Sequence, residues 1–343
     1  MKLKAEELAN ILRLRADPNI WDAHPVICAG AVLPTGPTSV AISLVIAQAR
    51  LQRGCVAFWA HPTTGKTSCI TALVAVLQKR FPGCGILRHE AKSNSKVVAE
   101  GSFIGDMLHS LEYCGKIQHT LADKRDQLRR ALFALGAERR HVIILLDEAQ
   151  ELAEPELRWL KEQGNWLVEH GFRVTTVLFG QEELIDLRDY VFSSGRSDLG
   201  IRFFQNLFEF EQIQRYQNLV PLLNGCDEGS EYPEGSGWSY TYFLWPEAYS
   251  NGFRLKDQAS TFWQAFARVS PLAKGEHGVS MVFVAATLSH FADATRDRDA
   301  PHFRPTIEDW IAAVTQTGYA QRTPPSPTRS RVLPKTHRKS EES

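Results

Sequence analysis

The stretch Ala60-His61-Pro62-Thr63-Thr64-Gly65-Lys66-Thr67 separates two segments with different periodicity. Residues 55–59, before it, form a short apolar run of strand character, and residues 67–79, after it, place apolar side chains at helical spacing. A loop between a strand and a helix N-terminus offers free backbone N–H groups and the positive end of the helix dipole to an anion. The stretch therefore predicts a phosphate-binding loop.

The residue types in this loop suit a nucleotide with its magnesium ion. Lys66 would reach the β- and γ-phosphates, and the Thr67 hydroxyl would coordinate Mg²⁺. The signature G-x-x-x-x-G-K-[ST] has glycine where this chain has Ala60, whose methyl group fits if φ stays negative. Taken alone, residues 64–67 are also compatible with an accidental loop. The predicted ATP-binding residues are Pro62, Thr63, Thr64, Gly65, Lys66, Thr67 and Ser68.

A second motif supports this interpretation. Residues 142–146 form a continuous apolar run, as expected of a parallel strand covered on both faces, and the run ends in Asp147 and Glu148. Asp147 would hold Mg²⁺ through its water shell, and Glu148 would polarise the attacking water. Acidic residues at a helix N-terminus are the alternative. Together with the upstream Gly65-Lys66-Thr67, the pair predicts a Walker B strand.

Composition constrains the partners and the compartment. The 343 residues include 39 basic and 39 acidic side chains, so any nucleic-acid contact has to come from a local patch. Six scattered cysteines show no metal or disulfide spacing. We expect a cytoplasmic protein without a membrane partner, because no signal-peptide core or apolar span is present.

A polar residue follows the next predicted strand. Residues 174–179 have strand character, and Gln181 stands at their carboxyl end. Its side chain is placed to touch the γ-phosphate or the attacking water, which makes it a catalytic candidate. Alternatively, Gln181 caps the helix that begins at Glu182.

Four segments together resemble the core of AAA+ ATPases and, within them, the TnsC/TniB branch of transposition ATPases, which is related to ExeA-like ATPases. The resemblance covers about residues 36 to 320. The segments that carry it are Thr63-Thr64-Gly65-Lys66-Thr67, Leu145-Leu146-Asp147-Glu148-Ala149, Leu178-Phe179-Gly180-Gln181-Glu182-Glu183-Leu184 and Ile201-Arg202-Phe203.

The resemblance implies an α/β fold with a parallel five-stranded sheet between helices and a C-terminal helical lid. It implies an ATPase that forms a ring or helical filament on double-stranded DNA and links a TniQ-like target-selection protein to a transposase. Arg202 would act in trans as the arginine finger, with Arg196 in reserve. Lids of this family often carry an arginine that faces the nucleotide. Residues 278–281 offer none, so either Arg254 or Arg268 substitutes or the contact is absent.

Two other functions stay open on the sequence. One is an ATPase of the replication or helicase-loader type, and the other is a nucleotide-dependent switch that signals through proteins without touching DNA. For DNA contact we predict Lys92 and Lys96, in the loop after the second strand, because that loop faces the central channel in AAA+ assemblies. The helix at 121–135 supplies a weaker set, Lys124 and Arg125 followed by Arg129 and Arg130. Alternatively, these basic side chains only solvate the surface.

We predict five parts along the chain. Residues 222–256 are rich in turn residues and aromatics, which favours an inserted hairpin or long loop whose rings pack on neighbours, contact a protein or stack on bases. The basic, proline-rich end should be disordered. The predicted parts are a peripheral N-terminal arm (1–35), the AAA+ core (36–221), the insertion (222–256), the helical lid (257–321) and the tail (322–343).

Overall fold

Five parallel strands form the sheet that carries the sequence motifs. The computed structural model describes residues 5–92, 98–270 and 278–321. The strands are β1 (Arg53–Trp59), β2 (Gly85–Glu90), β3 (His141–Asp147), β4 (Arg173–Gly180) and β5 (Leu207–Glu209). They pair in the order β2-β3-β4-β1-β5. The carboxyl ends of β1, β3 and β4 therefore meet at one edge, where Trp59 lies opposite Gly180.

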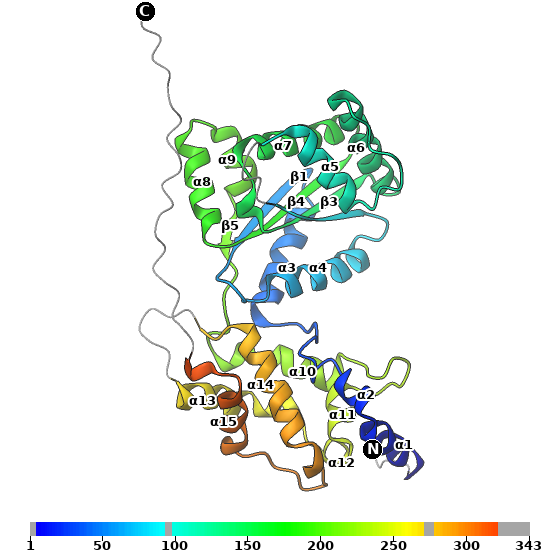
Figure 1. Ribbon diagram of the computed structural model, residues 1–343, viewed down its shortest axis with the longest axis vertical. Coiled ribbons are helices and arrows are strands. Elements are labelled where there is room, and N and C mark those ends of the chain that lie inside the picture. Colours follow the sequence, from blue (N-terminus) through cyan, green and yellow to red (C-terminus); the bar gives the residue numbers. More distant parts are fainter. Residues whose placement is uncertain (1–4, 93–97, 271–277, 322–343) are drawn as a thin grey trace, which may run out of the picture.

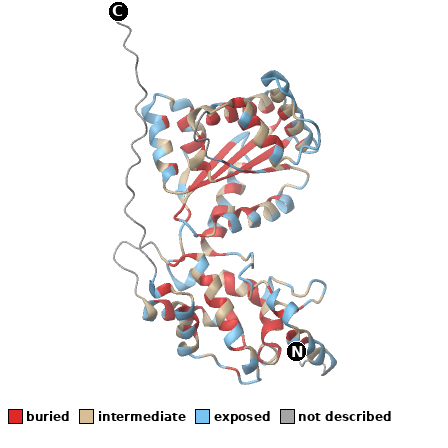
Figure 2. Ribbon diagram, viewed as in Figure 1, coloured by how far each residue is buried: buried red, intermediate tan, exposed pale blue. Residues whose placement is uncertain are grey.

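Helices cover both faces of this sheet (Figure 1). In β3, Val142 and Leu146 pack toward one face, while Ile143 and Leu145 pack toward the other. Figure 2 shows the strands buried between the two helical layers. The helices on one face are α3 (Gly36–Ala49) and α4 (Lys66–Arg80); those on the other are α5 (Glu100–Ser110), α6 (Leu121–Leu135), α7 (Glu154–Glu169), α8 (Glu183–Ser193) and α9 (Ser197–Phe204).

A helical domain, the lid, follows the sheet and has its own core. Rings of Phe262, Phe291 and Trp310 stack at its centre, with 3.8 Å between the centroids of Phe291 and Trp310. The predicted fold class, a parallel five-stranded sheet between helices with a helical lid, is confirmed. The lid helices are α10 (Val220–Glu228), α11 (Tyr240–Leu244), α12 (Pro246–Ser250), α13 (Ala259–Val269), α14 (Met281–Ala294) and α15 (Ile307–Gln316).

Among the described residues, no helix has the length and apolar character needed to cross a membrane. Short 3-10 turns connect several of the elements described above. The turns are η1 (Ala149–Glu151), η2 (Tyr216–Asn218), η3 (Leu255–Gln258), η4 (Arg296–Arg298) and η5 (Tyr319–Gln321).

The N-terminal segment, predicted as a peripheral arm, is part of the lid. Its helices are α1 (Ala5–Ala16) and α2 (Pro18–Asp22). Ile11 and Trp21 are buried in the same core as α13, α14 and α15. Trp21 Nε1 donates to Asp293 Oδ1 at 3.1 Å, and the Arg296 guanidinium lies 4.3 Å from the ring centroid. The N-terminal helices therefore pack into the lid, although the rest of the lid comes from the second half of the chain.

Residues 222–256 form short helices around an irregular stretch at 229–239, so the predicted hairpin is wrong and the predicted loop is confined to that stretch. They contain most of α10 and all of α11 and α12. Phe243 and Trp245 are almost fully buried, and Trp245 Nε1 donates to Thr295 Oγ1 at 3.1 Å. These two rings are covered by the lid's own core, so they are not available to stack on bases.

Candidate nucleotide site

The predicted phosphate loop joins β1 to α4 at the carboxyl edge of the sheet. Ala60 is fully buried and keeps a negative φ, and its N–H donates to the Gly180 carbonyl at 3.0 Å. The methyl group in place of the signature glycine is therefore accommodated. Gly65 has a φ of 101°, a conformation that glycine adopts without a steric penalty. Lys66 is the first residue of α4 and is buried beside this turn.

Asp147 ends β3 and faces the start of α4. Thr67 Oγ1 donates to Asp147 Oδ2 at 3.4 Å, so a hydroxyl and a carboxylate converge where Mg²⁺ is predicted. Burial raises the pKa of Asp147, against the opposing effects of the Glu148 N–H and the Lys66 charge. Mg²⁺ takes such oxygen ligands while it keeps several waters. Within the described part of the chain, no group of three or more His, Cys, Asp or Glu is placed to hold a metal ion.

Two amide side chains hold Glu148. Gln150 Nε2 donates to Glu148 Oε2 at 2.7 Å, and Gln181 Nε2 donates to the same oxygen at 3.1 Å. Gln150 Oε1 accepts from the Gln181 N–H at 2.9 Å, which closes a ring of three residues. Burial disfavours the Glu148 carboxylate, but the two amides and the Lys66 charge outweigh this effect and lower its pKa. Glu148 is therefore ionised.

The sequence predicted Gln181 at this place but missed Gln150. The Gln181 side chain lies beside Glu148 and makes no capping bond to α8, while its backbone carbonyl accepts from Leu184 in the first turn of α8. Gln150 stands in η1, two residues after Glu148. This short separation was the sequence signal that could have identified Gln150 as a neighbour of Glu148. The left-handed backbone of Glu148, with φ at 50°, turns the chain so that both side chains face one point.

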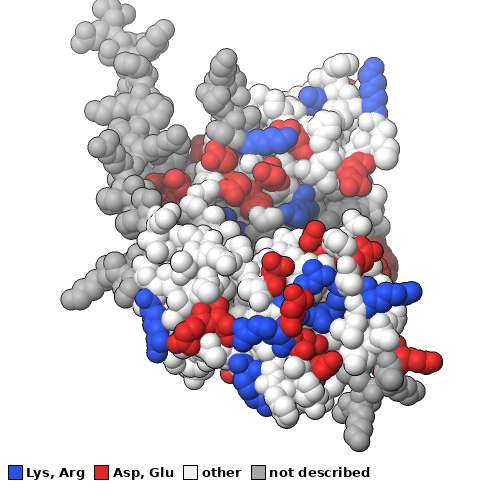
Figure 3. All heavy atoms as spheres, turned by 60° about the horizontal axis from the view of Figure 1, so that its bottom comes forward, with Lys and Arg blue, Asp and Glu red and all other residues white. Residues whose placement is uncertain are grey.

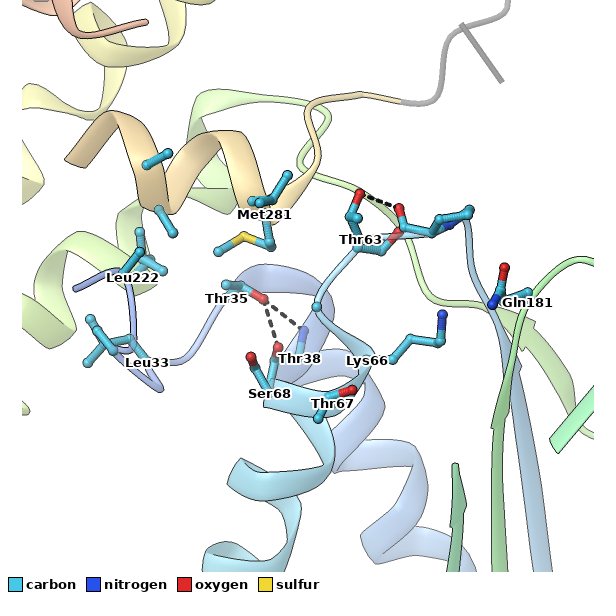
Figure 4. A pocket seen from close by; sticks show the side chains of 18 of the residues that line it. Leu33, Thr35, Thr38, Thr63, Lys66, Thr67, Ser68, Gln181, Leu222 and Met281 are labelled. Carbon is cyan, nitrogen blue, oxygen red and sulfur yellow. Dashed lines mark hydrogen bonds between the residues drawn. The ribbon is translucent and has the colours of Figure 1, made fainter. Parts of the chain in front are cut away.

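A cavity of about 480 Å³ lies between the core and the lid. Lys66, Thr67 and Gln181 line its polar end (Figure 4). Glu148 lines the same cavity. Its other end is apolar, which suits the flat face of a base. Sequence reasoning missed this wall because it combines the N-terminal segment, α10 and α14. The apolar wall consists of Ala29, Ala31, Leu33, Leu222, Met281, Val282, Ala285 and Ala286.

Ser280 and Met281 occupy the lid position where the resemblance implies an arginine. Neither Arg254 nor Arg268 lines the cavity. The Arg254 guanidinium lies 3.6 Å from the Tyr249 ring centroid, and its Nη1 donates to the Tyr249 carbonyl at 2.8 Å. Arg268 is exposed at the end of α13. Ser280 instead contacts the phosphate loop, with its Oγ 2.7 Å from the Thr63 carbonyl.

The two arginines predicted as fingers lie at opposite ends of α9. Arg202 Nη1 donates to the Arg53 carbonyl at 3.2 Å, at the start of β1 and away from the phosphate loop. Burial lowers its pKa. Arg196 pairs with Glu154 at 2.8 Å, at the N-terminus of α7 that follows β3, on the same edge as Asp147. Arg196 thus lies at the edge of the sheet that carries Asp147, whereas Arg202 lies at the opposite edge, where β1 begins.

The predicted DNA-contacting residues differ in how they are engaged. Lys92 is exposed beyond β2, with its Nζ 3.7 Å from Asp106 Oδ1, and Lys96 lies outside the described residues. Lys124 Nζ donates to the Gly101 carbonyl at 3.0 Å. Arg125 binds the buried Glu100 carboxylate through two hydrogen bonds, at 2.6 and 2.5 Å. Lys124 and Arg125 thus already connect α6 to α5.

Comparison with known proteins agrees with this geometry. Residues 49–187 match the family model described as an AAA domain. No curated protein matches the sequence. Cdc6p from Pyrobaculum aerophilum is similar with a TM-score of 0.50 and 15% identity, over 82% of this chain and 68% of that chain.

Two further solved structures are similar at lower TM-scores. The Aeropyrum pernix ORC1 protein, solved in complex with DNA, gives 0.47 at 13% identity, over 86% of this chain and 69% of that chain. Domain III of the Thermotoga maritima replication initiation protein DnaA gives 0.43 at 13% identity, over 83% and 93%. The family match and the sheet order agree on the fold: residues 49–187 match an AAA domain, and the chain has the AAA+ P-loop NTPase fold.

Proposed function

We propose that the chain binds ATP with Mg²⁺ and hydrolyses it in the cavity between the core and the lid. The observation that carries this proposal is the Glu148 carboxyl group, which accepts hydrogen bonds from Gln150 and Gln181 and lines the same cavity as Lys66. An ionised carboxylate at the carboxyl edge of a parallel sheet, next to a phosphate loop, is the arrangement that phosphoryl transfer to water needs.

Each polar side chain has a separate role in this proposal. The buried Lys66 ammonium binds the negatively charged phosphate oxygens. Thr67 and Asp147 would hold Mg²⁺, and the bound ion would neutralise part of the phosphate charge. Both amides bond Glu148 Oε2, so Oε1 is the oxygen that accepts a proton from the attacking water. Gln181 fixes the direction of that oxygen.

Two substitutions test the ATPase. Lys66→Ala should abolish ATP binding because it removes the buried positive charge, whereas Lys79→Ala, in the same helix, should leave binding intact. Glu148→Gln should bind ATP and lose hydrolysis by about 10²-fold or more, because an amide cannot accept the proton. Glu151→Gln is the matched control. Binding is measured by calorimetry and turnover by phosphate release; hydrolysis by Glu148→Gln at the unsubstituted rate would remove Glu148 from the mechanism.

We further propose that the ATP-bound chain assembles as a ring or helical filament on duplex DNA and links a TniQ-like target-selection protein to a transposase. The support is the resemblance of residues 63–67, 145–149, 178–184 and 201–203 to TnsC/TniB proteins. Lys92, 67% exposed at its side chain, is available to phosphate oxygens at the carboxyl edge of the sheet. On the lid face in Figure 3, basic and acidic side chains are interspersed, so that face offers no continuous basic track.

The DNA proposal is tested with the double variant Lys92→Ala/Lys96→Ala. Contacts to phosphates release counterions, so the variant should bind duplex DNA more weakly and reduce the salt slope by about 2 per subunit. Lys256→Ala, in the lid, is the control. Binding is followed across a salt series with a non-hydrolysable ATP analogue, and an unchanged slope would place the DNA contact on other residues.

The same assay separates the alternatives. Nucleotide-driven oligomers that form equally well without DNA would favour a signalling switch. DNA-dependent oligomers that recruit a helicase, and that neither a transposase nor a TniQ-like protein binds, would favour the replication or helicase-loader type.

A further inference from the structure

One serine of the lid reaches the phosphate loop. Ser280 Oγ donates to the Thr63 carbonyl at 2.7 Å, and Thr63 Oγ1 lies 2.8 Å from Ser280 Oγ. Ser280 is 8% exposed, so water competes little for these hydrogen bonds. The two residues are 217 positions apart in the sequence, and their contact joins the lid to the loop in which we place the phosphates.

Thr63 needs support because its backbone is strained. Its φ is 62°, in the left-handed region that β-branched residues rarely adopt. Ser280 bonds both the carbonyl and the hydroxyl of Thr63, and the Pro62 carbonyl, 2.6 Å from Thr63 Oγ1, is a further partner for that hydroxyl. The conformation of the phosphate loop at this residue is therefore stabilised from the lid.

The position of Ser280 shows that this contact replaces its ordinary role. Ser280 is the N-cap of α14, where a serine hydroxyl usually accepts a hydrogen bond from the first turn, but its side chain makes no such bond. The preceding residue, Val279, pairs with Ile213 through bonds of 2.8 and 3.1 Å. Ile213 belongs to the segment between β5 and α10. Ser280 is therefore held between the interdomain linker and the phosphate loop.

We propose that Ser280 is a positioning residue that keeps Thr63 left-handed, so that the affinity for ATP depends on where the lid stands. This inference rests on the proposed ATP binding. Because the coupling is reciprocal, a displacement of the lid that breaks the Ser280–Thr63 contact releases nucleotide, and bound nucleotide holds the lid in place.

The test uses the full chain and ATP as the probe. Ser280→Ala should weaken ATP binding about three- to tenfold, which corresponds to the loss of a hydrogen bond. Thr63→Gly accepts the left-handed backbone without help, so adding Ser280→Ala to Thr63→Gly should cost less than about twofold. Ser280→Thr, which keeps the hydroxyl, should bind like the unsubstituted chain. Thr315→Ala, a lid substitution that removes a hydroxyl bond inside α15, is the matched control.

A second measurement needs no nucleotide. Amide hydrogen exchange of residues 60–67 should speed up in Ser280→Ala and return toward the Thr63→Gly value in the double variant. If the chain binds no ATP but exchange changes in this way, the proposed function fails and the Ser280–Thr63 contact stands. If Ser280→Ala binds ATP normally with unchanged exchange, or weakens binding equally in the Thr63→Gly background, the inference is wrong.

Discussion

At the scale of single residues, the charge of Glu148 depends on Gln150 and Gln181. Burial alone would raise the pKa of this carboxyl, and the two amide donors reverse the effect. Lys66, Thr67, Asp147 and Glu148 were predictable because local spacing places them at a strand end and a helix start. Gln150 and Ser280 were not predictable, because their contacts depend on backbone turns and on how the lid sits over the loop.

This charge state predicts a pH dependence. A base works when it is deprotonated, and the pKa of Glu148 lies below its ordinary value, so protonation of Glu148 should limit hydrolysis only at a pH below the ordinary range of a glutamate. Gln150→Leu removes one of the two amide donors and leaves Gln181 and Lys66 to oppose burial, so the pKa of Glu148 should rise. The acid limb of the variant should therefore move to higher pH. Gln264→Leu, exposed in α13, is the control, and coincident limbs in the rate profiles of Gln150→Leu and the unsubstituted chain would contradict this explanation.

At the scale of elements, periodicity predicted the long helices and the sheet but failed for short pieces. The five-residue helices α11 and α12 offer too little sequence for a helical period, and the glycines and prolines around them favoured a hairpin. The segment at 1–35 has a weak amphipathic pattern because its apolar residues are spread over α1, α2 and the turns beyond them. Its partners in α14 are far away in sequence, so its burial was not visible.

Substitution of Trp21 tests whether the packing of the N-terminal segment stabilises the lid. Trp21→Ala should lower the free energy of unfolding of the lid by about 3–5 kcal/mol, since the ring is 1% exposed. Trp21→Phe keeps most of the packing and loses the bond to Asp293, so it should cost less. Chemical unfolding followed by circular dichroism gives both values. Equal stability of Trp21→Ala and the unsubstituted chain would mean that the segment does not contribute to the lid core.

At the scale of the whole molecule, the edge that carries the nucleotide cavity also carries a candidate contact to a neighbouring subunit. Glu154 and Asp198 hold Arg196 near the edge of the sheet that carries Asp147. The Arg196 Nε atom lies 3.1 Å from Asp198 Oδ1. The sequence placed both arginines just before the last strand. The ranking that put Arg202 first and Arg196 in reserve could not use their directions, because these follow from α9, which was not predicted as a helix.

Mixed assemblies test whether Arg196 acts in trans. Arg196→Ala should reduce ATP turnover by roughly 10³-fold in the assembled state, as expected for an arginine finger. Mixing these subunits with Lys66→Ala subunits should restore part of the activity at interfaces that join an intact cavity to an intact arginine. Arg202→Ala is the comparison, and we expect it to affect stability more than turnover. Mixtures that stay inactive would indicate a role for Arg196 within its own subunit.

The residues that line the nucleotide cavity come from early and late parts of the chain, so the ribosome makes them at different times. A ribosome releases the N-terminal segment first, then every strand and both phosphate-site motifs, and only later Met281 and Ala286 on α14. The sheet can form while the remainder is still being translated, but Ile11 and Trp21 pack against core residues of α13, α14 and α15 that have not yet been made. A nascent chain halted before α14 therefore holds the phosphate loop and the Asp147-Glu148 pair but lacks the α14 side of the apolar wall. Tight retention of nucleotide then marks a chain whose translation has passed α14.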